Sequence, residues 1–170
     1  SYKHNPTYYV ELIGNGLFNP YVLEYAPIEK RYRHIIARLE LVQSFLDTAS
    51  RNLTDSPEIW TTVAIDENNG NIELVDKTLR AKVPSNLRSE FDKAATNAIA
   101  AMRKFNDWLR QDLLSRKRDW RLGRELYEKK FRLVLGIDGT PDQILAQAEK
   151  QLASVRSEMF ALAKPLHQKW

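Results

Sequence analysis

The residues best suited to hold a metal ion are scattered along the sequence. The three histidines are His4, His34 and His167, and none has a second histidine or an acidic residue at a ligand spacing such as His-Glu-x-x-His. Cysteine is absent, which excludes disulfides, thiolate metal sites and cysteine nucleophiles. His34 lies beside an apolar helical stripe, so we expect a boundary histidine with a hydrogen-bond partner. The sequence predicts no metal site in this chain.

Four acidic residues could do acid–base chemistry or bind a divalent ion. Asp66, Glu67, Glu73 and Asp76 lie close together in sequence, and Asp66 and Glu73 share a face if the chain around them is one continuous helix. A solvated helix face explains the same cluster, and we favour that interpretation. The sequence also lacks the motifs of nucleophile elbows, P-loops and dinucleotide-binding folds, because Gly14-Asn15-Gly16 has no third glycine and no preceding strand. We therefore predict no catalytic residue here.

The positive charge is concentrated in one segment. The stretch from Arg103 to Arg132 holds eleven basic and five acidic residues, whereas the whole chain has a net charge of only +4. Aromatic residues interleave with the cations, which is typical of nucleic-acid binding. Several acids are spaced to pair with neighbours on the same helix, namely Asp107 with Arg103, Arg110 and Gln111, Glu125 with Lys129 and Glu128 with Arg132. The pattern therefore favours a solvated helix face over nucleic-acid binding, with an acidic protein partner as an alternative function for a self-contained interaction module.

Helices must position all of these residues. Apolar positions recur in alternating steps of three and four over Ile28–Leu53, Leu87–Leu113 and Leu145–Leu166, and no stretch alternates as a strand does. Such stripes predict an all-α fold, a bundle of about five to six mostly antiparallel helices. Between 57 and 81 the stripe continues through Asn68, and we favour one continuous helix over a helix broken by a turn near residue 70.

Prolines and capping residues indicate where the helices begin. Proline suits the first helical position because its missing N–H would be unpaired there, and a preceding Asn, Ser or Thr caps the helix. Three such pairs occur, Asn5-Pro6, Ser56-Pro57 and Thr140-Pro141. A length of 170 residues, with 43% hydrophobic and 28% charged residues, fits one globular domain. We therefore expect residues 1–170 to form a single helical domain. No apolar run is long enough to span a membrane.

A set of short motifs resembles a known family over nearly the entire chain. The motifs are Asn5-Pro6, Tyr8-Tyr9, Arg38-Leu39, Leu46, Ala49, Asn52-Leu53, Pro57, Ala98, Ala101, Trp108-Leu109, Arg121-Leu122-Gly123, Tyr127, Thr140-Pro141 and Glu158-Met159. Together they resemble the amino-terminal half of the bacterial family called domain of unknown function 885. One departure is visible, because relatives often carry a proline where Val42-Gln43 stands here.

The resemblance carries implications for function. Members of that family are longer and are similar to zinc-dependent metallopeptidases, with a metal motif in their carboxy-terminal half. The resemblance implies that this chain is a non-catalytic helical fragment that walls or covers a peptide-binding cleft. It also implies that the partner of the fragment is the carboxy-terminal half of the same protein, which binds the zinc. The last helical stripe runs to Leu166 without a stop signal, which also favours a fragment.

Three residues of the resembling motifs are candidates for substrate binding, namely Arg121, Gly123 and Tyr127. A glycine allows close approach of a backbone, and an arginine and a tyrosine could hold a substrate carboxylate or carbonyl. A purely structural role, in which Gly123 ends a loop and Tyr127 packs one turn later, is the alternative that we favour.

Overall fold

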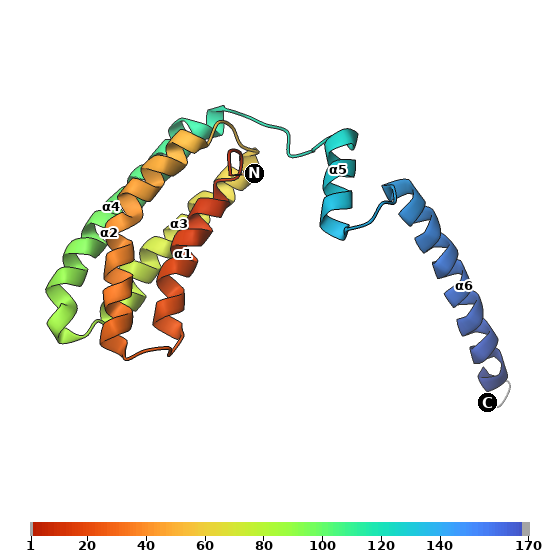
Figure 1. Cartoon of the computed structure of the whole chain (residues 1–170), viewed down its shortest axis with the longest axis horizontal. Helices are drawn as coiled ribbons and strands as arrows, with labels where there is room; N and C mark the ends of the chain where they lie inside the picture. Colours follow the sequence, from red (N-terminus) through yellow and green to blue (C-terminus); the bar gives the residue numbers. More distant parts are fainter. Residues whose placement is uncertain (1, 168–170) are drawn as a thin grey trace. The chain divides into compact units, whose positions relative to one another are not determined.

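The computed structural model describes residues 2–167, which form six α-helices and no strand (Figure 1). This confirms the predicted all-α class. The chain divides into two compact units, Ser1–Trp120 and Arg121–Trp170. The expectation that residues 1–170 form one domain stays a prediction.

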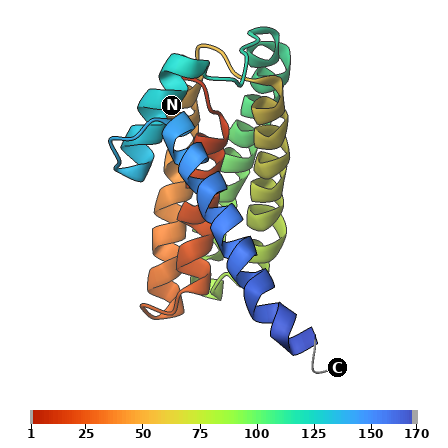
Figure 2. The same cartoon turned by 90° about the vertical axis from the view of Figure 1, so that its right-hand side faces the viewer.

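The first unit is a four-helix bundle. Its helices are α1 (Thr7–Val22), α2 (Ile28–Asn52), α3 (Glu58–Glu73) and α4 (Arg88–Gln111). Helix α2 packs against α1 and α4, and α3 packs against the same two helices, so the order around the bundle is α1, α2, α4, α3. Successive helices run antiparallel, and the α1–α2 and α3–α4 connections lie at one end (Figures 1 and 2).

The predicted stripes of α2 and α4 form the core of this bundle. Every stripe residue between Tyr32 and Leu53 is buried, and so is every stripe residue between Leu87 and Leu113. Only Ile28, in the first turn of α2, departs from the prediction, with 46% of its surface exposed. Burial of Leu-, Ile- and Phe-sized side chains contributes roughly 1.5–3 kcal/mol each, so these two stripes supply much of the driving force for folding.

The helix after Pro57 is continuous, as we predicted. Helix α3 passes directly into a π-helical segment, Leu74–Leu79, so the polar stretch near residue 70 lies inside a helix. The segment ends against α2, where the Tyr32 hydroxyl donates a hydrogen bond to the Leu79 carbonyl oxygen at 2.8 Å. Burial raises the pKa of Tyr32 to about 12, so this hydroxyl stays protonated and keeps donating.

Two of the three predicted helix caps are confirmed and one is wrong. The Asn5 side-chain oxygen accepts from the Thr7 N–H at 3.1 Å, and Thr140 exchanges side-chain and backbone hydrogen bonds with Gln143 as in a capping box. The hydroxyl of Ser56 donates instead to the Pro57 carbonyl oxygen. Ser56 is buried because its backbone pairs with the segment that follows α4, through the Arg116 carbonyl and the Arg118 N–H.

The second unit holds α5 (Arg124–Leu135) and α6 (Pro141–His167), and neither helix has a buried residue. Gly136 ends α5 in a left-handed conformation, with φ +63°. We predicted that the apolar stripe of α6 packs in the bundle, but its large side chains are exposed in the structure. Two helices of 12 and 27 residues cannot enclose a core of their own. The exposed stripe, called the α6 stripe below, consists of Leu145, Leu152, Val155, Met159, Leu162 and Leu166.

None of the described helices combines the length and the hydropathy needed to cross a membrane.

Candidate functional site

The three residues predicted to bind substrate lie at the beginning of α5. Gly123 directly precedes the helix with φ +74°, a conformation that strains residues with a side chain. The Tyr127 N–H donates to the Gly123 carbonyl oxygen at 3.0 Å, so these two residues are in contact across one helical turn. Arg121 lies in the exposed connection before them. The Tyr127 ring is 49% exposed and packs on Phe131 at a centroid distance of 5.8 Å. Substrate binding by these residues stays a prediction.

Ion pairs compensate much of the basic segment from Arg103 to Arg132. Two predicted pairs are confirmed, Asp107 with Arg110 at 3.5 Å and Glu125 with Lys129 at 2.8 Å. Glu128 pairs with Arg124 rather than with the predicted Arg132. The segment is also divided between the two units, since the first unit ends at Trp120. Cations held by acids of the same helix are the arrangement expected of a solvated face.

The acidic cluster on α3 is compensated in the same way. Glu73 pairs with Lys77 at 3.1 Å, Asp76 pairs with Arg80 at 3.2 Å, and Asp66 is exposed. Within residues 2–167, no three His, Asp or Glu side chains come together in a way that could hold a metal ion. A zinc site in a longer protein, which the family resemblance implies, stays a prediction.

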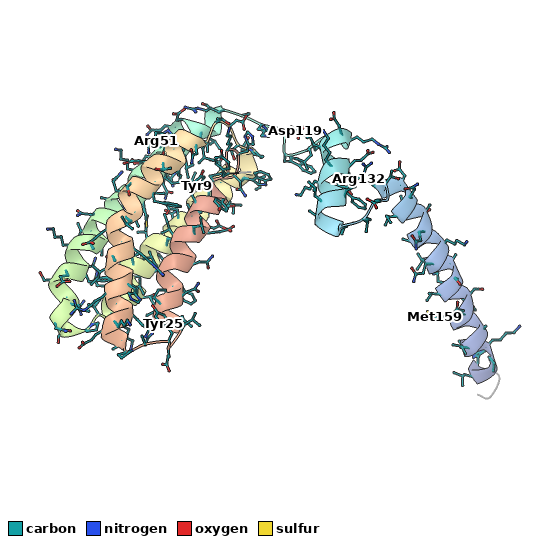
Figure 3. All side chains as sticks on the ribbon, viewed as in Figure 1. Tyr9, Tyr25, Arg51, Asp119, Arg132 and Met159 are labelled. Carbon is teal, nitrogen blue, oxygen red and sulfur yellow. The ribbon has the colours of Figure 1, made fainter. Side chains whose placement is uncertain are left out.

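Two histidines serve as hydrogen-bond partners at the ends of the bundle. The Tyr25 hydroxyl and His34 Nδ1 are 2.8 Å apart and their rings stack, which confirms the boundary role predicted for His34. Figure 3 shows Tyr25 at the α1–α2 connection. His4 Nδ1 contacts Asp55, and the Lys3 carbonyl accepts from the Thr54 N–H at 3.0 Å. The segment before α1 is therefore tied to the connection between α2 and α3.

A buried asparagine network crosses the middle of the bundle, and sequence reasoning missed it. Asn68 of α3 is fully buried, and its amide donates to the Met102 carbonyl at 2.9 Å and to Asn106 Oδ1 at 2.8 Å. Asn106 of α4 donates in turn to Asn69 Oδ1 at 2.9 Å. Part of the signal was present, because Asn68 occupies an apolar-stripe position of its helix, whereas Asn106 follows the stripe residue Phe105 directly. A polar residue in phase with an apolar stripe indicates a buried polar contact that can fix register.

A further asparagine joins α3 to α1. Asn71 donates to the Val10 carbonyl oxygen at 2.8 Å. A Cβ atom on Gly14 would lie only 2.6 Å from Asn71 Oδ1, so a side chain at residue 14 would displace this contact. Gly14 therefore allows the close approach of α1 and α3.

Next to this contact, α1 and α3 border a pocket of about 350 Å³ whose lining includes Glu67 and Glu11 as well as apolar side chains. Burial, followed by the charge of Glu11, raises the pKa of the Glu67 carboxyl above its ordinary value. Its Oε2 atom is buried and has no hydrogen-bond partner. A carboxyl in this state can exchange a proton with a ligand or with solvent.

The raised pKa predicts how Glu67 affects stability. Above pH of about 4.3 the unfolded chain releases this proton more readily than the native bundle, so the free energy of unfolding falls as pH rises through the interval up to the native pKa. Glu67→Gln should therefore stabilise the protein at pH 7 by less than about 1 kcal/mol, and the gain should vanish at pH of about 3.5. Urea denaturation at both pH values measures it. Glu73→Gln, at an exposed glutamate paired with Lys77, is the control, and an equal gain there would contradict the assignment.

A second pocket, between α1 and α2, is apolar. Its volume is about 310 Å³, and Arg38 lies at its rim as the charged lining residue. Sequence reasoning noted Arg38 and Gly16 separately, but their juxtaposition depends on the register of α1 against α2.

The family model for "Bacterial protein of unknown function (DUF885)" matches residues 5–169. None of the curated proteins matches the chain. The chain is similar to the solved structure of a candidate lipoprotein of unknown function from Shewanella oneidensis, with a TM-score of 0.81 and 23% identity. That match covers 100% of this chain and 32% of the other, so this chain spans about a third of its length.

Proposed function

Because the chain belongs to the DUF885 family of bacterial proteins of unknown function, we propose that it is a non-catalytic helical portion of a longer protein and packs against the remainder through the α6 stripe. The observation that carries the proposal is the exposure of that stripe. Its residues are 43–74% exposed over six turns of one helix face. An apolar face of this length is typical of a surface that another protein element covers. The threefold greater length of the similar solved chain supports an intramolecular partner.

The finer part of the proposal concerns what the remainder does. We propose that it resembles a zinc metallopeptidase, that zinc binds in that remainder, and that this portion walls or covers a peptide cleft. Arg121 and Tyr127 would then face the peptide, with Gly123 allowing close approach of its backbone. The exposure of all three residues supports this role, since a peptide could reach them.

The parent reading frame tests the two parts separately. We expect it to continue beyond Trp170 for a few hundred residues and to encode a His-Glu pair followed a few residues later by another histidine. A frame that continues without this motif would overturn the metallopeptidase part. A frame that ends at Trp170 would overturn the proposal as a whole.

Hydrogen exchange tests the α6 stripe. In the full-length parent we expect the α6 amides to exchange at least about tenfold more slowly than in the 170-residue chain, because opening α6 would expose the apolar face. The double variant Leu152→Asp with Met159→Asp should abolish that protection. The matched control, Gln147→Asp with Ser157→Asp, adds the same charge to the opposite face of α6 and should keep it. Equal exchange of α6 in the two proteins would rule out packing through the stripe.

A further inference from the structure

The pocket between α1 and α2 has an unusual lining. Seven of its eight lining residues are apolar or glycine, and the eighth is Arg38. Leu12 and Leu41 flank its mouth with exposed side chains, 46% and 63% respectively, and Phe45 is half-buried beside them. A volume of about 310 Å³ lies at the lower end of the range for small-molecule sites. The pocket is therefore suited to a short apolar chain.

Arg38 supplies the positive charge of this pocket. One of its terminal nitrogens donates to the Gly16 carbonyl oxygen of α1, which holds the guanidinium across the rim of the pocket. Among the residues that the structure describes, no carboxylate forms an ion pair with Arg38, whereas Arg80 pairs with two carboxylates and Arg116 with one. A guanidinium has five N–H donors, so most of those of Arg38 remain for a ligand. This geometry favours a carboxylate, which arginine binds through two parallel hydrogen bonds.

Gly16 borders the pocket without a side chain. A glycine inside a helix costs about 1 kcal/mol relative to alanine, so its presence in α1 calls for a reason. A Cβ atom at residue 16 would have no neighbour within 4 Å, and Gly16 lines both this pocket and an adjoining pocket of about 300 Å³. The adjoining pocket is lined by polar residues as well, among them Asn15, Asn19 and Tyr25. Arg38 thus lies at the junction between an apolar and a polar section of one groove.

We propose that this groove binds a medium-chain alkyl carboxylate, with the alkyl chain in the apolar section and the carboxylate on Arg38. The lining decides between this ligand and a peptide with an apolar carboxy-terminal residue. Besides Arg38, the apolar section offers no polar side chain, so the amide groups of a peptide would be buried there without hydrogen-bond partners. An alkyl carboxylate has one polar group, and one cation satisfies it. The site does not depend on the proposed function, because all of its residues lie in the bundle.

Titration of the 170-residue chain with octanoate, followed by amide NMR shifts, tests the proposal. We expect a dissociation constant of about 0.1–1 mM, with shifts confined to α1 and α2. Octanol should bind about tenfold more weakly, since it lacks the charge that Arg38 binds. Equal binding of octanol would overturn the carboxylate assignment. No binding of octanoate, or shifts along the α6 stripe instead of the groove, would overturn the site itself.

Two substitutions make the test specific. Arg38→Gln should weaken octanoate binding about fivefold to tenfold and leave octanol binding unchanged. Gly16→Val should abolish binding of both compounds by filling the pocket, and helix propensity alone makes valine no worse than glycine in α1. Gly70→Val is the matched control, because Gly70 is also helical, has open space around it and does not line this groove. Wild-type affinity in Gly16→Val, with wild-type circular dichroism, would contradict the proposal.

Discussion

Replacing Arg31 by alanine should lower the free energy of unfolding of the bundle by about 3 kcal/mol, a large fraction of the stability of a small domain. Arg31 is buried on α2, and its guanidinium donates to the Ala26, Pro20 and Tyr21 carbonyl oxygens at 2.9, 3.1 and 2.7 Å. Because α1 ends at Val22, the Pro20 and Tyr21 carbonyls are among the last four of that helix and have no partner within it. Alanine would leave all three oxygens unpaired, and urea denaturation measures the loss.

Two further variants identify the cause of this loss. Arg31→Lys keeps the charge but lacks the planar fork that reaches several carbonyls, so it should recover only part of the stability. Arg33→Ala removes an exposed arginine from the same turn of α2 and should change stability by no more than about 0.5 kcal/mol. If Arg31→Ala were as stable as Arg33→Ala, Arg31 would not cap α1.

Arg31 also shows where sequence reasoning stops. The stripe from Tyr32 to Leu53 was predictable because burial on one helix face repeats with the helical period, and that period is visible in one segment alone. The burial of Arg31 depends on where a different helix ends and which of its carbonyls lack partners. The same holds for Ser56, whose predicted capping role was wrong because its backbone pairs with a segment 60 residues away in sequence.

The α6 stripe and the groove at Arg38 are two further features in which the structure differs from what the sequence predicted. A periodic stripe predicts that a face is apolar, but it does not identify the partner that covers it, and α6 has the pattern without the burial. To predict the groove, one must know which helices are neighbours, because Gly16 and Arg38 acquire a joint role only when α1 and α2 are adjacent. Among the three residues predicted to bind substrate, Gly123 has a positive φ, the backbone conformation that favours glycine.

The asparagine network places polar side chains in the center of the bundle, and their burial there costs free energy. Its three linked side chains join α3 to α4, and Asn71 joins α3 to α1, so α3 is fixed to both neighbours by directional bonds. Apolar stripes alone would allow neighbouring helices to slide by a turn with little loss of burial. We therefore expect the network to define the register of α3, and with it the shape of the adjoining pocket at Glu67.

Asn68→Asp should destabilise the bundle by about 3–5 kcal/mol at pH 7, because it places a carboxylate in the core without a countercharge. The amide of Asn68 donates to two oxygens, those of Met102 and Asn106, and a carboxylate would face both of them as an acceptor. The native state would therefore hold the new carboxyl as the neutral acid, with a pKa raised above that of the unfolded chain. The loss should grow as pH rises above about 3.9 and become small below it, where the protonated carboxyl can donate one hydrogen bond.

Asn69→Asp makes the comparison decisive, because it changes the same functional group one residue further along α3. Asn69 is exposed and takes part in the network only as an acceptor, through the hydrogen bond from Asn106. A carboxylate can accept that bond equally well, so this variant should lose less than about 1 kcal/mol at pH 7. Urea denaturation of both variants between pH 4 and 8 separates a buried charge from the mere loss of an amide. Similar losses at residues 68 and 69, or a loss at residue 68 that does not change with pH, would contradict a buried charge at residue 68 as the cause.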